Sequence, residues 1–302
     1  MTETVAVLGT GRMGGAMVGT LRSAGFEVVA WNRDRDKANE VARTTGASVV
    51  ETASDAAAAA DVALTSLADD TAVEAVYADA LEGFHAGQVV LEMSTIAPET
   101  VRAVEPSVRA RGATLLDAPV SGSVPVVERG ELLIMVGGDA DALERTRPVL
   151  DALSAKIVHV GELGSGAAMK LSVNALVHGL AVALSESLVL AERAGVDRTK
   201  AYEVFASGAA AAPFVLYKRA AFERPDESPV AFTLDLVEKD LDLILALAER
   251  VGVTMPQAAS NRDEVRSALT AGMRGKDMSA LAEYLRVAHP PNWPPADREP
   301  TG

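Results

Sequence analysis

Hydrophobic and polar positions alternate along the first half of the chain in a pattern typical of buried strands separated by amphipathic helices. Short apolar runs, each followed by turn residues and a segment with helical spacing, occupy 5–8, 26–31, 62–67, 89–93, 114–118, 132–136 and 157–160. This regular alternation predicts an α/β fold with a doubly wound, mostly parallel sheet. The alanine-rich stretch 53–60, flanked by Asp55 and Asp61, fits a short surface helix.

The pattern changes after Gly161. A segment without proline runs from Ala167 to Ala194, and helical stretches follow at about 199–207, 230–250, 256–272 and 278–287. We therefore predict an α/β domain at 1–162, an all-helical domain at 163–289 and a loosely held, proline-rich tail at 290–302. The long, weakly charged helix at 167–194 predicts contact with a second copy in a homodimer or higher homo-oligomer. The alternative is a helix buried wholly within its own chain.

A glycine-rich turn follows the first apolar run, with the sequence Gly9-Thr10-Gly11-Arg12-Met13-Gly14. In a strand-turn-helix unit of this spacing, Gly9 permits a tight exit from the strand, Gly11 lets the backbone approach a pyrophosphate, and Gly14 allows close packing of the helix. The N–H groups at the helix start attract phosphate. The turn therefore predicts a dinucleotide site formed by these six residues. The alternative is a turn that needs its glycines for packing alone.

The end of the second strand indicates which dinucleotide is preferred. A site for NAD usually has a carboxylate there, hydrogen-bonded to the ribose 2′-hydroxyl, whereas this chain has Asn32 followed by Arg33. An amide and a guanidinium accept a 2′-phosphate, which a carboxylate repels, so NADP(H) is favoured over NAD(H). The alternative is that Arg33 and Arg35 pair with Asp34 and Asp36 on a solvated loop.

Composition limits the other possibilities. The chain has 302 residues, 49% of them apolar and 23% charged, as expected for a soluble protein with two full cores. A net charge of −14 argues against nucleic-acid binding, and the absence of cysteine excludes thiolate chemistry and disulfides. No His and carboxylate cluster has metal-ligand spacing, so we predict no metal. A first strand at Val5 leaves no room for a signal peptide, which predicts a cytoplasmic protein without a membrane segment.

Five ordered motifs carry a resemblance to the β-hydroxyacid dehydrogenase family, which includes 3-hydroxyisobutyrate dehydrogenases and glyoxylate or succinic semialdehyde reductases. The resemblance spans Val5 to about Ala288 and implies an N-terminal Rossmann domain and an all-helical C-terminal domain. It also implies hydride transfer between a nicotinamide and a short hydroxy acid or its aldehyde or keto partner. The motifs are Gly9-Thr-Gly-Arg-Met-Gly14, Met93-Ser-Thr-Ile-Ala-Pro98, Asp117-Ala-Pro-Val-Ser-Gly122, Gly164-Ser-Gly-Ala-Ala-Met-Lys170 with Asn174, and Lys239-Asp240-Leu241.

Lys170 is the candidate proton donor for this chemistry. Hydride delivery to a carbonyl builds negative charge on oxygen, so the site needs an acid and a polar group beside it. Lys170 lies among small and apolar residues near the start of a helix, and both surroundings favour the neutral amine. Asn174 lies one turn further on the same face. By the resemblance, Lys170 matches the family's catalytic lysine and Asn174 its partner, whereas His178 is expected to be packed or interfacial.

The turn Ser121-Gly122-Ser123 is the candidate site for a substrate carboxylate. Its backbone amides and hydroxyls can form an anion nest, and this is where the resemblance places a small carboxylate-bearing substrate. The alternative is an ordinary turn that needs Gly122 for a positive φ. The family usually has a second glycine where this chain has Ser123, which bears on the size of substrate accepted.

Two further segments are assigned through the resemblance. Ser94 and Thr95 resemble the family's contact near the nicotinamide end, although Thr95 could instead cap a helix that starts near Pro98. Lys239 and Asp240 resemble the segment that closes the site from the helical domain. Lys239 could neutralise a substrate carboxylate and Asp240 could orient a lysine. Without the resemblance, they look like part of a charged helical face.

These residues favour an NADPH-dependent reductase of a small aldehyde or keto acid, with Lys170 as the acid. The pair Asn32-Arg33 resembles the glyoxylate and succinic semialdehyde reductase branch more than the NAD-dependent 3-hydroxyisobutyrate dehydrogenases, which are one alternative. A second alternative is an imine reductase, a group that usually replaces the catalytic lysine. A third is a catalytically silent dinucleotide-binding scaffold, which would have no chemical need for Lys170, Asn174 and the serine-glycine turn together.

Overall fold

The computed structural model describes residues 3–288 and divides into two compact units, Met1–Val173 and Asn174–Gly302. Helix α8 (Ser165–Arg193) is continuous through this division, so its first turns belong to the N-terminal unit. The sheet of that unit ends at Gly161, one residue before the boundary expected from the sequence. The predicted tail at 290–302 lies outside the described residues.

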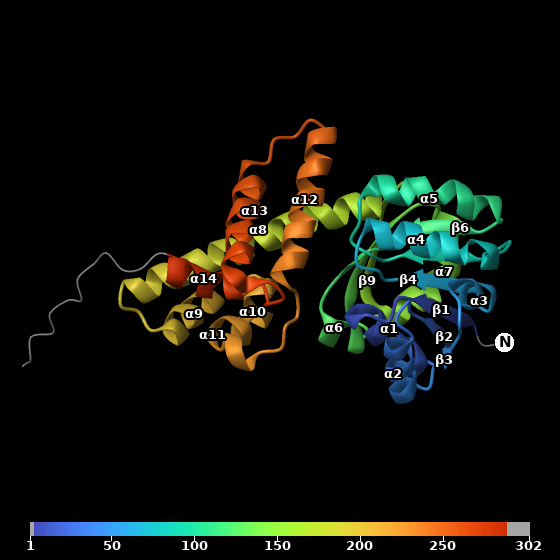
Figure 1. The fold of residues 1–302 in the computed structure, drawn as a ribbon, viewed down its shortest axis with the longest axis horizontal. Helices are drawn as coiled ribbons and strands as arrows, with labels where there is room; N and C mark the ends of the chain where they lie inside the picture. Colours follow the sequence, from blue (N-terminus) through green and yellow to red (C-terminus); the bar gives the residue numbers. More distant parts are fainter. Residues whose placement is uncertain (1–2, 289–302) are drawn as a thin grey trace, which may run out of the picture. The chain divides into compact units, whose positions relative to one another are not determined.

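The N-terminal unit is built on a nine-stranded sheet with the order β3-β2-β1-β4-β5-β6-β8-β7, in which β9 also pairs with β8 (Figure 1). The strands from β3 to β6 are parallel, β8 runs antiparallel to β6 and β7, and β9 is parallel to β8. The predicted doubly wound, mostly parallel sheet is therefore confirmed. The strands are β1 (Thr4–Leu8), β2 (Glu27–Trp31), β3 (Ser48–Val49), β4 (Val62–Thr65), β5 (Val89–Glu92), β6 (Thr114–Asp117), β7 (Val120–Ser121), β8 (Leu132–Gly137) and β9 (Ser154–Gly161).

Two cores cover the two faces of this sheet because successive side chains of a strand point to opposite sides. In β1, Val5 and Val7 pack into one core with α1 and α7, while Ala6 and Leu8 pack into the other with α3, α4 and α5. The alanine-rich helix predicted at 53–60 is present as α3. The helices of this unit are α1 (Arg12–Ser23), α2 (Arg35–Thr45), α3 (Ala53–Ala58), α4 (Asp70–Ala80), α5 (Pro98–Ala110), α6 (Val124–Glu128) and α7 (Ala140–Leu153).

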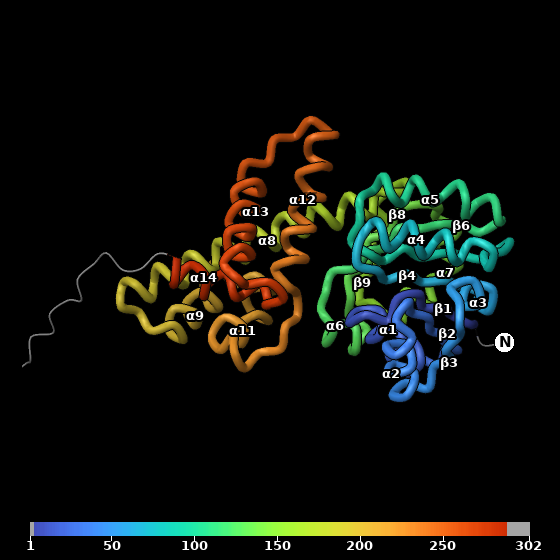
Figure 2. Tube along the Cα trace, in the orientation of Figure 1, coloured from blue at the N-terminus to red at the C-terminus, as the bar shows by residue number. Residues whose placement is uncertain are grey.

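The C-terminal unit is helical, as expected, and Figure 2 shows α12 and α13 side by side as a hairpin. The helix predicted at 230–250 begins later, at Leu234, because the Thr233 side chain accepts a hydrogen bond from the Leu236 N–H and caps it. Short helices α10 and α11 lack a long apolar period and were not predicted. The helices are α9 (Arg198–Ser207), α10 (Pro213–Tyr217), α11 (Arg219–Glu223), α12 (Leu234–Arg250), α13 (Pro256–Ala268) and α14 (Ala280–Ala288).

A buried ion pair holds the segment that precedes α12. Lys218 Nζ lies 2.8 and 2.9 Å from the two carboxylate oxygens of Asp277. The same carboxylate accepts hydrogen bonds from the backbone N–H groups of Ala231 and Phe232, at 2.9 and 3.1 Å. Burial alone would raise the pKa of Asp277, but the hydrogen bond and charge of Lys218 outweigh it and hold that pKa below its usual range. Asp277 therefore links α10, the α12 entry and the turn before α14.

Within residues 3–288, α8 is the one helix long and apolar enough to cross a membrane on length and composition alone, with a mean hydropathy of 1.6. A core helix of a soluble protein meets the same criterion. Several large apolar side chains of α8 are exposed, among them Leu176 and Leu190.

Candidate active site

The three glycines of the β1–α1 turn have distinct surroundings. Gly9 adopts a φ of +104°, and a Cβ there would overlap the carbonyl oxygen of Ser66. A Cβ on Gly14 would overlap the carbonyl oxygen of Gly9, so α1 approaches the turn as closely as backbone allows. By contrast, a Cβ on Gly11 would meet nothing within 4 Å. Gly9 and Gly14 are required by packing, whereas Gly11 borders open space that a pyrophosphate can enter.

The start of α1 faces that space. Gly11 caps the helix without a side chain, and the first intrahelical bond runs from Gly15 N–H to Gly11 C=O at 2.7 Å. The backbone N–H groups of the first turn thus precede the helical ladder and suit an anion. Thr10 is buried, and its hydroxyl has no hydrogen-bond partner within the described chain. The side chain of Met13 instead packs against the sheet core, so only its backbone is placed to meet a phosphate.

Asn32 braces the turn from the end of β2. Its Oδ1 accepts a hydrogen bond from the Thr10 N–H at 3.1 Å, and its Nδ2 donates to the carbonyl of Asp34 at 2.9 Å. The amide therefore links the glycine turn to the residue that caps α2. Arg33, the next residue, is exposed and forms no ion pair with any residue between 3 and 288.

The alternative pairing of Arg33 and Arg35 with Asp34 and Asp36 is not found. Arg35 forms an ion pair with Glu51, and Asp34 accepts a hydrogen bond from the Asp36 N–H at 3.2 Å. The carboxylate of Asp34 is thus engaged as the N-cap of α2. Arg33 is the guanidinium at the end of β2 that no carboxylate of the described chain neutralises.

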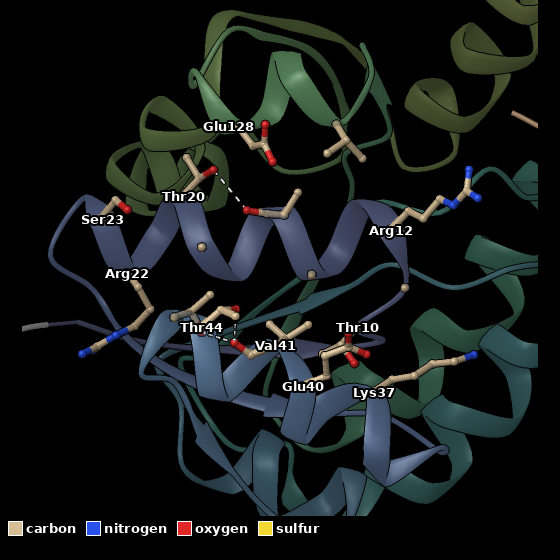
Figure 3. A pocket seen from close by; sticks show the side chains of 16 residues that line it. Thr10, Arg12, Thr20, Arg22, Ser23, Lys37, Glu40, Val41, Thr44 and Glu128 are labelled. Carbon is tan, nitrogen blue, oxygen red and sulfur yellow. Dashed lines mark hydrogen bonds between the residues drawn. The ribbon is translucent and has the colours of Figure 1, made fainter. Parts of the chain in front are cut away.

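An open groove of about 1040 Å³ runs along α1, between α2 and α6. Figure 3 shows Arg12 and Lys37 at the end nearest Thr10, where two cations flank the glycine turn. The groove continues along α1 to Ser23 and is not lined by the ends of β4 and β5. It therefore overlaps the predicted cofactor site only at Thr10, Gly11 and Arg12.

Ser94 joins the ends of β4 and β5. Its Oγ accepts a hydrogen bond from the Leu67 N–H at 2.8 Å, and its own N–H donates to Glu92 Oε1 at 2.7 Å. Glu92 is fully buried and also accepts a 2.6 Å hydrogen bond from Thr65 Oγ1. Burial raises the pKa of Glu92, against the opposing effect of these hydrogen bonds. Sequence reasoning missed Glu92, although a carboxylate inside an apolar run was the available signal.

Thr95 is not the N-cap residue of α5, the position that the alternative gave it. The N-cap of α5 is Ala97, and the hydrogen-bond acceptor comes from α4. Asp70 Oδ1 accepts from the Ala97 N–H at 2.9 Å and from Thr100 Oγ1 at 2.5 Å. Thr95 lies in the loop between β5 and α5 that Ser94 begins.

The predicted anion turn lies between β7 and α6. Ser121 is the last residue of β7 and pairs with Leu133, and Ser123 is the N-cap of α6. Gly122 has a φ of +147°, and a Cβ there would lie 2.6 Å from a methyl group of Leu132. The backbone therefore requires glycine at this position whether or not the turn binds a carboxylate.

Lys170 and Asn174 occupy successive turns of α8. Lys170 is half-buried in the N-terminal unit, and Asn174 is buried and is the first residue of the C-terminal unit. Because the two residues are four positions apart on a continuous helix, they project from the same face. The predicted spacing is thus realised on one helix.

Asn174 belongs to a buried polar cluster in the C-terminal unit. Asp240 is fully buried, and its Oδ2 accepts a hydrogen bond from Asn174 Nδ2 at 2.7 Å and lies 3.3 Å from His178 Nε2. Lys239 Nζ lies 3.1 Å from Asp240 Oδ1. His178 is packed, as expected, with its ring 5.8 Å from that of Phe232. The fold thus adds His178 to the predicted set Asn174, Lys239 and Asp240.

The neighbouring carboxylates of α12 behave differently. Glu238 and Asp242 form exposed ion pairs with Arg266 of α13, at 2.9 and 2.8 Å. They form a solvated charged face, which was the alternative expected from the sequence for Lys239 and Asp240. Asp240 is not part of it, because helical rotation turns its side chain into the interior of the unit. Between residues 3 and 288, no group of three or more His, Asp and Glu side chains is placed to hold a metal ion.

The N-terminal unit has a mostly parallel sheet with an open glycine turn, and a helix that carries a lysine and an asparagine continues from it into the helical unit. These features define a two-domain oxidoreductase that uses a nicotinamide dinucleotide. Residues 4–161 match the family described as the NAD binding domain of 6-phosphogluconate dehydrogenase. Residues 164–285 match the family described as NAD-binding of NADP-dependent 3-hydroxyisobutyrate dehydrogenase. The chain belongs to the β-hydroxyacid dehydrogenase family, whose members act on the CH–OH groups of hydroxy acids.

Relatives are similar over nearly the whole chain. Glyoxylate/succinic semialdehyde reductase 1 of Arabidopsis thaliana is 33% identical, over 94% of this chain and 99% of its own. The structure of Mycobacterium tuberculosis 3-hydroxyisobutyrate dehydrogenase with L-serine is 31% identical, with a TM-score of 0.83 over 95% of this chain and 100% of its own. The structure of Psf3 in complex with NADP+ and 2-OPP is 25% identical, with a TM-score of 0.85 over 93% and 99%.

Proposed function

We propose that this protein is an NADPH-dependent reductase of short aldehyde or keto acids, with glyoxylate and succinic semialdehyde as the leading substrates. The observation that carries the proposal is Lys170 one helical turn from Asn174, whose amide is bonded to the buried Asp240. The Arabidopsis relative is named for these two substrates. Lys170 acts as the acid in reduction and as the base in the reverse oxidation.

When NADPH is bound, its nicotinamide would supply the hydride. Lys170 gives its proton to the carbonyl oxygen as charge develops there. Asn174 donates one amide hydrogen to Asp240, which fixes the amide and leaves its second N–H to donate to the same substrate oxygen. A carboxylate on the substrate meets the N–H groups of the Ser121–Ser123 turn, and Lys239 adds positive charge. Because Lys239 lies against Asp240, the negative charge of Asp240 offsets part of the positive charge that Lys239 offers to the substrate carboxylate.

The preference for NADP(H) rests on the end of β2. Asn32 is engaged with Thr10 and Asp34, so Arg33 is the side chain left to meet a 2′-phosphate. The Psf3 structure holds NADP+. In this arrangement Asn32 positions the turn and Arg33 discriminates between the two dinucleotides.

Replacing Arg33 with alanine is expected to weaken NADPH binding by about 10- to 100-fold and NADH binding far less. A hydrogen bond to a charged group contributes about 1.5–3 kcal/mol, and the 2′-phosphate is the part that NADH lacks. Fluorescence titration of each cofactor measures the two Kd values. Arg35→Ala is the matched control, because Arg35 is engaged with Glu51. Equal losses for both cofactors in Arg33→Ala would remove the basis of the assignment.

The substrate assignment is tested by following NADPH and NADH oxidation with five compounds: glyoxylate, succinic semialdehyde, methylmalonate semialdehyde, tartronate semialdehyde and a cyclic imine. Rapid turnover of glyoxylate or succinic semialdehyde with NADPH is the expected result. Turnover of methylmalonate semialdehyde with NADH alone would instead indicate a 3-hydroxyisobutyrate dehydrogenase. Turnover of the imine alone would contradict the role given to Lys170, and no turnover at all would favour a silent dinucleotide-binding protein.

We further propose that the exposed apolar line of α8 is covered by a second copy of the chain. Met169, Leu176, Leu180 and Leu190 are exposed at helical spacing along this helix, with Leu176 73% exposed. Leu176→Glu is expected to convert a dimer to a monomer, measured by light scattering after size exclusion. The control Val287→Glu alters an equally exposed apolar residue on α14. A wild-type protein that is monomeric at all concentrations would overturn the proposal.

A further inference from the structure

The first turn of α8 is fastened to the sheet by one buried carboxylate. Asp117, the last residue of β6, is fully buried. Its Oδ1 accepts a hydrogen bond from the Gly164 N–H at 2.8 Å, and its Oδ2 accepts one from the Ala167 N–H at 2.7 Å. Gly164 precedes the helix and has no side chain with which to cap it. Asp117 therefore performs, from 47 residues away, the capping that a local side chain usually provides.

Glycines let the helix come this close. A Cβ on Gly166 would lie 2.6 Å from the carbonyl oxygens of both Asp117 and Met135. A Cβ on Gly137 of β8 would overlap Asp117 Oδ1. Real Cβ atoms do not approach so closely, so Gly137 and Gly166 are needed for the carboxylate to reach the helix. The approach of α8 to Asp117 thus explains the second glycine of the Gly164-Ser-Gly166 motif.

Lys170 follows directly on this anchored turn. Ala167, whose N–H is held by Asp117, is three residues before Lys170 and therefore lies on nearly the same side of α8. A helix held at its N-terminus by two charge-assisted hydrogen bonds cannot slide or rotate at that end without breaking them. The position of the Lys170 backbone is thereby set by β6.

We propose that Asp117 is a positioning residue for Lys170, and that its carboxylate sets where the ammonium group is delivered to the substrate oxygen. The inference rests on the proposed role of Lys170 as the acid. Asp117 touches neither substrate nor cofactor in this role and acts through the first turn of α8. Glu92, which pairs with Asp117 on the adjacent strand β5, accepts a hydrogen bond from the Ser94 N–H in a similar manner. Buried carboxylates at two adjacent strand ends thus position two different segments of the site.

The test combines Asp117→Asn with Lys170→Ala in a double-mutant cycle. An asparagine amide offers one acceptor and presents donor hydrogens where the second acceptor stood, so one of the two backbone N–H groups loses its partner. A small displacement of a catalytic group costs up to about 100-fold in rate. Asp117→Asn is therefore expected to lower kcat about 10- to 100-fold, with the NADPH Kd unchanged. In the Lys170→Ala background it should cause little further loss, because the group that it positions is gone.

Two matched variants separate positioning from general damage. Asp139→Asn alters another aspartate that caps a helix of the same unit, accepting from the Ala142 N–H of α7 at 2.7 Å, and should leave kcat unchanged. Gly166→Ala keeps the Asp117 carboxylate but pushes the helix from the sheet, and should show the same coupling to Lys170. If Asp117→Asn fails to fold, the Gly166→Ala cycle carries the test.

Hydrogen exchange gives a readout that does not depend on turnover. The amides of Gly164 and Ala167 should exchange faster in Asp117→Asn than in the wild type, while amides of the central sheet should not change. An unchanged kcat, or an equal loss in the presence and absence of Lys170, would overturn the positioning role. A wild-type enzyme that turns over none of the aldehyde acids would instead refute the proposed function, so the two failures are distinguishable.

Discussion

Lys170→Ala is expected to lower kcat for aldehyde-acid reduction by about 100- to 10,000-fold, the usual contribution of a positioned general acid. The substitution should lower turnover and leave cofactor binding unchanged, because the proposed NADPH contacts lie in the β1–α1 turn and at the end of β2. Steady-state assays give kcat, and fluorescence titration gives the NADPH Kd. Binding should remain within about twofold of the wild type, since no charge-assisted bond to the dinucleotide is removed.

Lys170→Arg distinguishes the contribution of proton transfer by Lys170 from the contribution of its positive charge. Arginine keeps the positive charge but does not release a proton at accessible pH, so it should be nearly as inactive as alanine. Lys200→Ala is the control, because Lys200 is an exposed lysine of α9 paired with Glu203. Wild-type turnover in Lys170→Arg would show that charge alone matters, and loss of NADPH binding in Lys170→Ala would show that the lysine holds the cofactor.

Lys218→Met is expected to lower the free energy of unfolding by about 3–5 kcal/mol, because it leaves Asp277 buried without its counter-charge. The remaining hydrogen bonds to Asp277 come from backbone N–H groups and cannot replace a cation. Urea unfolding monitored by circular dichroism measures the change. Lys200→Met, the same substitution in an exposed pair, should leave the midpoint almost unchanged. A similar midpoint shift in both variants would show that the buried ion pair contributes no more to stability than the exposed pair.

The same pair predicts an acid dependence. Burial raises the pKa of Asp277, but the hydrogen bond and charge of Lys218 outweigh burial, and the net pKa lies below its usual range. A carboxylate with a lowered folded-state pKa stabilises the protein fully above its unfolded-state pKa of about 3.9, and that stabilisation is lost as the pH falls through the folded-state value. In Asp277→Asn, unfolding free energy should therefore change less between pH 5 and pH 3 than in the wild type. An equal change in both would assign the acid dependence to other carboxylates.

The elements with the strongest periodicity were predicted well. The apolar run at 89–93 became β5 and that at 132–136 became β8, and the long segment from Ala167 became α8. The two-residue strands β3 and β7 were missed because they leave no apolar run. The start of α12 was misplaced because the chain before Thr233 is held by Asp277, a contact between residues more than forty positions apart.

Within the candidate site, the sequence was informative where function depends on local spacing. The glycine turn and the Lys170 and Asn174 pair are recognisable because their geometry is set within one strand-turn-helix unit or one helical turn. The sequence predicted that Asn32 meets the 2′-phosphate, but it did not reveal that the Asn32 side chain accepts a hydrogen bond from the Thr10 N–H. It also left Glu92 unassigned, because nothing in a strand sequence says which backbone groups its buried carboxylate will meet.

By itself, the sequence determined the fold class, the order of the longer elements, the dinucleotide turn and the residues that can carry a proton. These follow from periodicities of two and 3.6 residues and from the conformational freedom of glycine, which are local properties of a chain. The tertiary structure alone decided which partners hold those residues in place. Asp117 meets Ala167 across 50 residues, and Asn174 meets Asp240 across 66. Such pairs form only when packing brings distant segments together and leaves a buried carboxylate that must find donors.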